Sequence, residues 1–237
     1  MLAVAPSASF LRLGMLLSAL IVCACVIGLT MHRDFYAGRR REDFFCFYTN
    51  LSNLMVLCYF ALIAPRLYAS ARLRPIVPHA EFSLMMSIML TFCVFHLLIF
   101  PPVFAAARHA ERTREFYIIF VDNIIVHYIV PWLVFAYWLL CSPGKAALRA
   151  ADALLWTLIP SVYLLCMLTG AKRRGIIKET GSPYPYPFLD VSVLGWRRVA
   201  VICTSLYGAC AAAGFAAIAI LRGLIALLGV GHAFILI

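Results

Sequence analysis

The sequence predicts an all-α, polytopic membrane protein built as a bundle of six transmembrane helices. Of its 237 residues, 65% are hydrophobic and only 13% are charged, whereas soluble domains carry about 25% charged residues. The mean hydropathy is +0.96. The chain also contains six apolar runs of roughly 18 residues or more, the length needed to cross a hydrocarbon core of about 30 Å. These observations exclude a water-soluble globular domain.

The expected spans follow one another with short connections, so residues 1–237 are expected to form a single transmembrane domain. They lie near residues 10–31, 44–64, 82–101, 117–140, 152–170 and 199–221. The first apolar run covers about 19 residues, from Leu13 to Met31, and a signal-peptide core has about 7 to 15. The first run is therefore interpreted as a transmembrane helix.

The later spans carry their own boundary signals. The second begins with the aromatic run FFCFY (44–48), which is typical of the membrane interface. The third is expected to stop at Pro101–Pro102, and the fourth contains Pro131, which is expected to kink it and leave the carbonyl of His127 without a helical donor.

Two segments flank the sixth span. The loop before it, 172–198, contains the prolines of SPYPYP (182–187), which are incompatible with a regular helix and favour an extended segment over the mouth of the bundle. The tail, 222–237, is too short for another span. It either lengthens the last helix or lies in the interface.

The charge distribution bears on partners and orientation. The net charge is +10, but the basic residues are scattered through the loops, so we expect no nucleic-acid partner. The side with the first, third and fifth loops carries 13 of the 20 Lys and Arg residues, against 7 on the side of the termini. The positive-inside rule then predicts that both termini lie outside.

Polar residues within the spans indicate where a site lies. They are Thr49, Asn50, Ser52 and Asn53 in the second span, His96 in the third, and Asp122, Asn123 and His127 in the fourth. Such residues usually face the bundle interior or a cavity. At 1.5 Å per residue, Thr49 lies about 8 Å and His127 about 15 Å from the same surface. We therefore expect one polar cavity, covered by the proline-rich loop.

Each of these residues also has a purely structural interpretation. A helix threonine such as Thr49 often bonds back to its own turn, and Asn50 and Asn53 are compatible with contacts between helices. His96 is compatible with a packing role. His127 favours a functional role because it is ionisable, deep in the membrane and close to a proline.

Three stretches carry a family resemblance: FFCFYTNLSNLMV (44–56), DNIIVHYIVPWLVFAYWLL (122–140) and YPYPFLD (184–190). With them the chain resembles the androgen-induced-gene family of multipass membrane threonine hydrolases, which has bacterial relatives of about this length. The resemblance implies an intramembrane nucleophile at Thr49 and a catalytic histidine at His127. It also implies fatty-acid esters of hydroxy fatty acids as substrates and a bacterial cytoplasmic membrane as location. The polar residues around the threonine are spaced differently in animal members.

The reaction that we expect is ester hydrolysis inside the membrane, with a lipophilic ester in the bilayer as partner and with neither a cofactor nor a metal. A neutral His127 takes the proton of Thr49 as the hydroxyl attacks. Such a reaction also needs donors for the oxyanion and an acid that orients the histidine. The candidate donors are Asn53, His96, Tyr184 and Tyr186, and the candidate acids are Asp122 and Asp190.

Two other functional classes remain open at this stage. His96 and His127, on adjacent spans, are a possible pair of axial haem ligands in a redox protein. Asp122 and His127 are also compatible with a proton relay in a small-solute transporter. A purely structural role is a third alternative, and the sequence leaves the physiological substrate and the oligomeric state undetermined.

Overall fold

The computed structural model describes residues 8–35, 41–107 and 111–227. In this part of the chain, six helices are long and apolar enough to cross a membrane. They are Ser9–Arg33, Tyr48–Ala69, Arg74–Ile99, Arg114–Cys141, Asp152–Arg174 and Val191–Leu227. The predicted all-α bundle of six helices is confirmed, and the chain is an integral, multi-pass membrane protein.

Several spans are divided by short turns of a different helix type. The α-helices are α1 (Ala8–Phe35), α2 (Arg41–Phe44), α3 (Tyr48–Cys58), α4 (Ala64–Ala69), α5 (Val77–Val94), α6 (Phe100–Ala107), α7 (Arg114–Ile124), α8 (Val130–Cys141), α9 (Asp152–Leu155), α10 (Leu158–Arg174) and α11 (Val191–Leu227). The π-helical turns are η1 (Tyr59–Ile63), η3 (Phe95–Ile99) and η4 (Ile125–Ile129). The 3₁₀ turns are η2 (Arg74–Ile76), η5 (Lys145–Ala147) and η6 (Pro187–Leu189).

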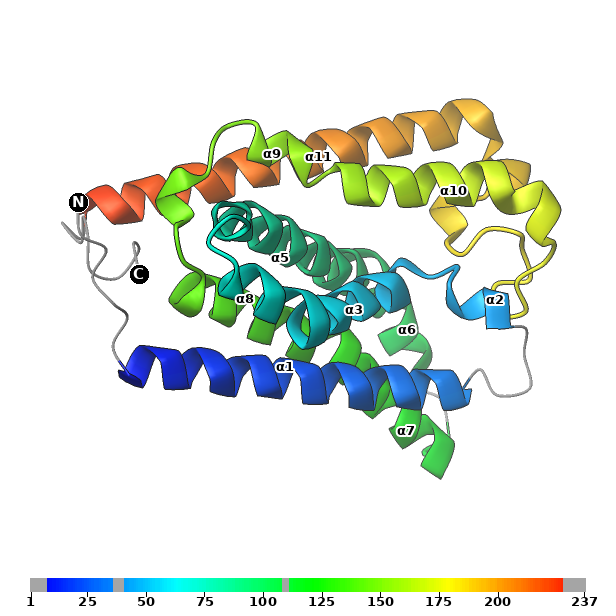
Figure 1. The fold of residues 1–237 in the computed structure, drawn as a ribbon. Coiled ribbons are helices and arrows are strands. Elements are labelled where there is room, and N and C mark those ends of the chain that lie inside the picture. The colour runs from blue at the N-terminus through cyan, green and yellow to red at the C-terminus, as the bar shows by residue number, and fades with distance from the viewer. Residues whose placement is uncertain (1–7, 36–40, 108–110, 228–237) are drawn as a thin grey trace.

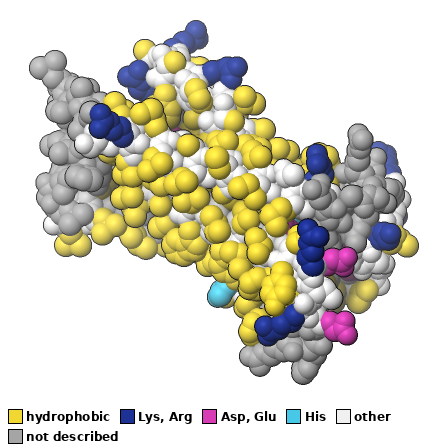
Figure 2. Space-filling model, turned by 90° about the horizontal axis from the view of Figure 1, so that it is seen from below, with side chains coloured by type: hydrophobic (Ala, Val, Ile, Leu, Met, Phe, Trp, Pro, Cys, Tyr) yellow, Lys and Arg dark blue, Asp and Glu magenta, His cyan; other side chains and the backbone are white. Residues whose placement is uncertain are grey.

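Four helices form the centre of the bundle. Helices α1 and α5 each pack against both α3 and α8, and α10 and α11 run along one side of this group (Figure 1). The core between them is mostly apolar, with Ile21, Val56, Phe82 and Val130 fully buried. The outer surface is also apolar: Figure 2 shows a hydrophobic band across the middle of one face, with Lys and Arg near its ends. Such a band matches the hydrocarbon core of a membrane.

All three π-helical turns precede a proline by the same interval. They end at Ile63, Ile99 and Ile129, and Pro65, Pro101 and Pro131 each follow two residues later. Proline lacks the N–H that the carbonyl four residues earlier needs, and a local widening of the helix accommodates the missing donor. The distortion expected at Pro131 is therefore present, as a π-helical turn that contains His127.

Helix boundaries differ from the expected ones in the second, third and sixth spans. The second runs from Tyr48 to Ala69 instead of 44–64, so most of the aromatic run precedes it. The third starts at Arg74 and continues through Pro101 as α6, where we expected an end, because the turn η3 absorbs the missing donor. The sixth starts at Val191 and contains a break at Gly195, whose φ is 73°. Part of the expected tail lengthens α11 to Leu227. The rest of it, 228–237, lies outside the described residues.

A glycine allows α1 to approach the helix that carries His127. A Cβ atom at Gly28 would lie 2.6 Å from the Cγ1 atom of Val126 and 3.0 Å from the Cγ2 atom of Ile125. A contact of 2.6 Å between carbon atoms that are not bonded is shorter than van der Waals packing allows, so a larger residue at position 28 would push α1 away from η4. Gly28 therefore helps to fix the position of η4 in the bundle.

Candidate active site

Thr49 and His127 lie in direct contact inside the bundle. The Oγ1 atom of Thr49 is 3.1 Å from the Nε2 atom of His127. Both residues are buried, with exposed fractions of 8% and 5%. Thr49 is the second residue of α3, and His127 is the central residue of η4. The structure thus brings together the two residues that the depth argument placed in the same half of the membrane.

The second imidazole nitrogen determines which atom of His127 carries the proton. Its Nδ1 atom lies 3.1 Å from the carbonyl oxygen of Asn123, and a carbonyl can only accept a hydrogen bond. In the neutral ring Nδ1 is therefore the donor, and the lone pair of Nε2 faces the hydroxyl of Thr49. The ring also stacks on Phe95, with centroids 3.7 Å apart. His127 is held in the orientation and tautomer that a general base requires.

Asn53 fastens the two helices that carry this pair. Its Nδ2 atom donates to the carbonyl oxygen of Thr49 at 2.8 Å and to that of Val126 at 3.1 Å. An amide nitrogen has two N–H groups, so both are used. Asn53 is therefore a positioning residue for α3 and η4. The expectation that it donates to the oxyanion is wrong, because it has no N–H group left.

A hydroxyl chain supports Thr49 from the other side. The Oγ atom of Ser52 donates to the carbonyl oxygen of Thr49 at 3.0 Å and lies 2.8 Å from the Oγ1 atom of Thr91. Because Ser52 has a single proton and gives it to Thr49, Thr91 must donate to Ser52. This chain ties α3 to α5 next to the candidate nucleophile.

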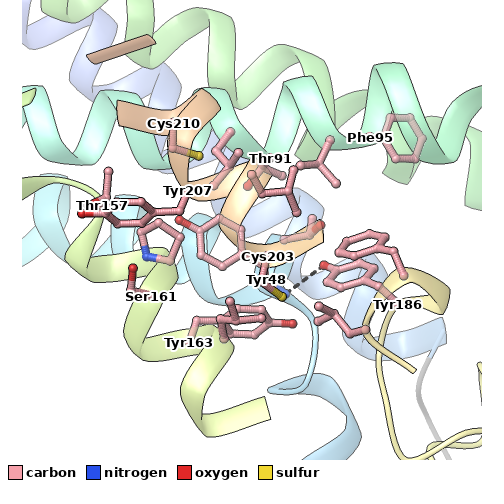
Figure 3. Close-up of a pocket in the computed structure, with 18 of the residues that line it drawn as sticks. Tyr48, Thr91, Phe95, Thr157, Ser161, Tyr163, Tyr186, Cys203, Tyr207 and Cys210 are labelled. Atoms are coloured by element: carbon pink, nitrogen blue, oxygen red, sulfur yellow. Dashed lines mark hydrogen bonds between the residues drawn. The ribbon is translucent and has the colours of Figure 1, made fainter. Parts of the chain in front are cut away.

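Thr49 is one of the residues that line a cavity with a mostly apolar surface, and Figure 3 shows this cavity with Tyr48, Tyr163 and Tyr186 in its wall. Its walls come from α3, α5, η3, α10, α11 and the loop before α11. The lining includes Tyr48, Thr49, Leu90, Thr91, Val94, Phe95, Ile99, Pro160, Tyr163, Leu164, Tyr186, Phe188, Leu189, Leu206 and Tyr207. The cavity volume is about 120 Å³, whereas one water molecule needs on the order of 10 to 15 Å³ by the same measure. It therefore has room for part of an organic molecule.

Residues 182–190, which we call the covering segment, close one end of this cavity. Tyr186, Phe188 and Leu189 line it, and the backbone N–H of Tyr48 donates to the Tyr186 hydroxyl at 3.1 Å. The predicted position of the proline-rich loop is confirmed. At its end, Asp190 accepts hydrogen bonds from the hydroxyls of Ser182 and Ser192, which lower the pKa of the carboxyl. Asp190 thus anchors the covering segment.

The remaining predicted site residues lie apart from the pair. Among the described residues, neither Asp122 nor Asp190 contacts His127, because Asp122 pairs with His32 and the Asn123 carbonyl takes the place of the expected acid. His96 is exposed at the lipid-facing surface and bonds to the Tyr128 hydroxyl at 3.0 Å. Tyr184 is a buried residue of the covering segment but is not among the residues that line the cavity.

Comparison of the chain with known proteins identifies no family. No family model, curated protein or solved structure matches the chain. The geometry of Thr49 and His127 is therefore the observation that points to a function. Both imidazole nitrogens of His127 are engaged by protein groups, and one of these bonds would have to break before the residue ligated a haem iron.

Sequence reasoning missed two residues that shape the site. Phe95 supports the His127 ring, and nothing distinguishes it in an apolar span that contains several phenylalanines. Thr91 offered a signal, because a hydroxyl in the middle of the third span needs a partner. Ser52 on the neighbouring span is a second hydroxyl that needs a partner, and the two side chains are in fact bonded to each other.

Proposed function

We propose that this protein is an intramembrane ester hydrolase with Thr49 as nucleophile and His127 as general base. The observation that supports this most strongly is the 3.1 Å contact between the Thr49 Oγ1 and His127 Nε2 atoms, combined with the Nδ1 bond that leaves the Nε2 lone pair facing the hydroxyl. Covalent catalysis generally requires a nucleophile, a base within hydrogen-bond distance of it, and a third group that orients the base.

The chemistry proceeds in two halves. Thr49 Oγ1 bonds to the ester carbonyl carbon, its proton passes to Nε2 of His127, and the carbonyl electron pair moves to the oxygen. When the tetrahedral intermediate collapses, the alcohol leaves with the proton from Nε2, and the acyl group remains on Thr49. Water then attacks this acyl-enzyme with His127 again as base, which releases the acid and restores the hydroxyl.

The substrates that we propose are lipophilic esters, such as fatty-acid esters of hydroxy fatty acids. Most of the surface of the cavity beside Thr49 is apolar, and a bilayer delivers such molecules laterally. The two reacting residues are also those that the resemblance to the androgen-induced-gene family assigns. Membership of that family and a place in a bacterial cytoplasmic membrane are part of this proposal.

Hydrolysis by the purified protein in liposomes tests this function. We expect kcat/KM for a p-nitrophenyl ester to rise by at least about tenfold from the acetyl to the dodecanoyl chain, because each buried methylene contributes about 0.8 kcal/mol. The released nitrophenolate is measured by absorbance. If wild-type protein with an intact thermal transition hydrolyses none of the esters above the rate of empty liposomes, the proposed function is wrong.

A further inference from the structure

The proposed hydrolase needs a donor for the oxyanion, and this inference rests on that proposed function. When Thr49 attacks, negative charge develops on the former carbonyl oxygen. A single well-placed donor at this point is typically responsible for about 10² to 10³ in kcat. The donor must belong to a group that lines the cavity beside Thr49 and has a proton to give.

Several polar groups near Thr49 have already used their protons. Asn53 spends both amide N–H groups on backbone carbonyls, and Thr91 donates to Ser52. The Tyr163 hydroxyl donates to the carbonyl oxygen of Cys46 at 2.7 Å. These three residues therefore cannot meet a new negative charge without breaking a bond that the fold already makes.

Tyr186 differs from these groups because its hydroxyl is an acceptor in the bond that it makes. The backbone N–H of Tyr48 donates to it at 3.1 Å (Figure 3), which leaves its own proton to donate. Tyr48 is the first residue of α3, and the N-terminus of a helix carries a partial positive charge. The Tyr186 hydroxyl thus lies at the positive end of the helix that bears the nucleophile. The N–H group that donates to it belongs to Tyr48, the residue before Thr49.

The ring of Tyr186 is fixed in this place by its neighbours. It stacks on Phe188 with an interplanar angle of 2° and centroids 5.2 Å apart, and it meets Phe47 edge-on at 6.2 Å. Donors that are held in position cost little reorganisation when charge develops. Tyr186 therefore has the rigidity that an oxyanion donor requires, although it lies in a loop.

The hydroxyl of Tyr186 stays protonated at neutral pH. Burial raises its pKa above the ordinary value of 10.0, and interactions with the backbone N–H groups of Tyr48 and Thr49 and with the hydroxyls of Thr49 and Tyr163 lower the pKa by less than burial raises it. Tyr186 and Thr49 line the same cavity, and the hydroxyl is bonded to the backbone N–H of the residue before Thr49. The group is therefore a phenol with a proton in the cavity that contains the nucleophile.

We infer that Tyr186 is a further catalytic residue, whose hydroxyl donates a hydrogen bond to the oxyanion formed on attack by Thr49. The Tyr48 N–H continues to donate to the same oxygen, so the helix terminus polarises the donor toward the charge. Tyr186 does not transfer its proton, and its O–H bond stays intact throughout. The only proton that moves in this step is that of Thr49, which goes to His127. The covering segment thereby completes the site as well as closing it.

Replacing Tyr186 with phenylalanine tests this role, because only the hydroxyl is lost and the stacked ring remains. We expect kcat for a long-chain p-nitrophenyl ester to fall by about 10²-fold with KM changed less than threefold and the thermal transition retained. Tyr184→Phe is the matched control: it removes the same group from the same segment, outside the cavity, and is expected to keep wild-type kcat.

A rival donor in the cavity has its own variant. The hydroxyl of Tyr48 is buried and has no hydrogen-bond partner among the described residues, and the inference requires that Tyr48→Phe lower kcat by less than threefold. If Tyr186→Phe folds and keeps kcat within threefold of wild type, or if Tyr48→Phe alone causes the large loss, the inference about Tyr186 is overturned. Wild-type turnover that depends on Thr49 would leave the proposed function standing in either case.

A more acidic phenol provides a readout that does not depend on the phenylalanine variant. With a fluorinated tyrosine at position 186, we expect kcat to fall as pH rises through the pKa of that phenol, because a phenolate has no proton to donate. The protein with ordinary tyrosine is expected to lose no activity over the same pH range. A pH profile identical to that of wild type would contradict the donor role.

Discussion

Thr49→Val is expected to lower kcat for hydrolysis of a long-chain ester by about 10⁴-fold or more, roughly 5.5 kcal/mol in the activation free energy. Valine keeps the branched shape of threonine but replaces the hydroxyl with a methyl group, so the attacking oxygen and the proton for His127 both disappear. Stopped-flow or steady-state release of p-nitrophenolate from the purified variant in liposomes measures this loss.

Two further variants separate the loss of the nucleophile from a loss of structure. Thr49→Ser restores a hydroxyl and is expected to recover at least about a tenth of wild-type kcat. Thr169→Val makes the same change at an exposed threonine of α10 that bonds to its own helix, and it is expected to change nothing. Activity of the Thr49→Val variant within tenfold of wild type would exclude Thr49 as the attacking residue.

His127→Gln is expected to lower kcat by about 10² to 10⁴-fold, the range that general-base catalysis contributes. A glutamine amide can still form a hydrogen bond with the Thr49 hydroxyl, but it does not take up a proton at neutral pH. The geometry of the pair is thus largely preserved while the base is removed. The same ester assay measures the effect, and a melting curve in detergent establishes that the variant is folded.

His96→Gln is the matched control for this experiment. His96 lies on the adjacent span at the lipid-facing surface and bonds to Tyr128, so its replacement is expected to leave hydrolysis unchanged. Equal losses in the two variants would mean that the histidines act together, as the haem interpretation requires. In that case the general-base role of His127 would have to be abandoned.

The position of the site was predictable from depth in the membrane. Thr49 and His127 are polar residues in two spans that enter from the same side, and their distances from that surface placed them in one half of the bilayer. Their contact at 3.1 Å follows because polar groups in a membrane protein turn inward and find one another. The covering segment was predictable for a different reason, since its closely spaced prolines are incompatible with a regular α-helix, and only Pro187–Leu189 forms a short 3₁₀ turn.

The partner that orients His127 was not predictable from regular helix geometry. An acid was expected, and the structure supplies the carbonyl of Asn123. This residue precedes a π-helical turn, where the helix is wider than usual. In three spans of this chain a π-helical turn ends two residues before a proline. The prolines in the middle of these spans were therefore the signal in the sequence for local widening of the helix. The sequence alone did not tell how each helix would absorb the missing donor.

Covalent labelling identifies the residue whose oxygen attacks the substrate. Purified protein in liposomes is treated with a long-chain fluorophosphonate, digested and analysed by mass spectrometry, alongside the Thr49→Ala and His127→Ala variants. We expect the phosphonyl group to be attached to the peptide containing Thr49 in the wild type. We expect no such adduct in Thr49→Ala and much slower labelling of Thr49 in His127→Ala. Labelling that persists unchanged in Thr49→Ala, with the adduct on another residue, would contradict the role of Thr49 as nucleophile.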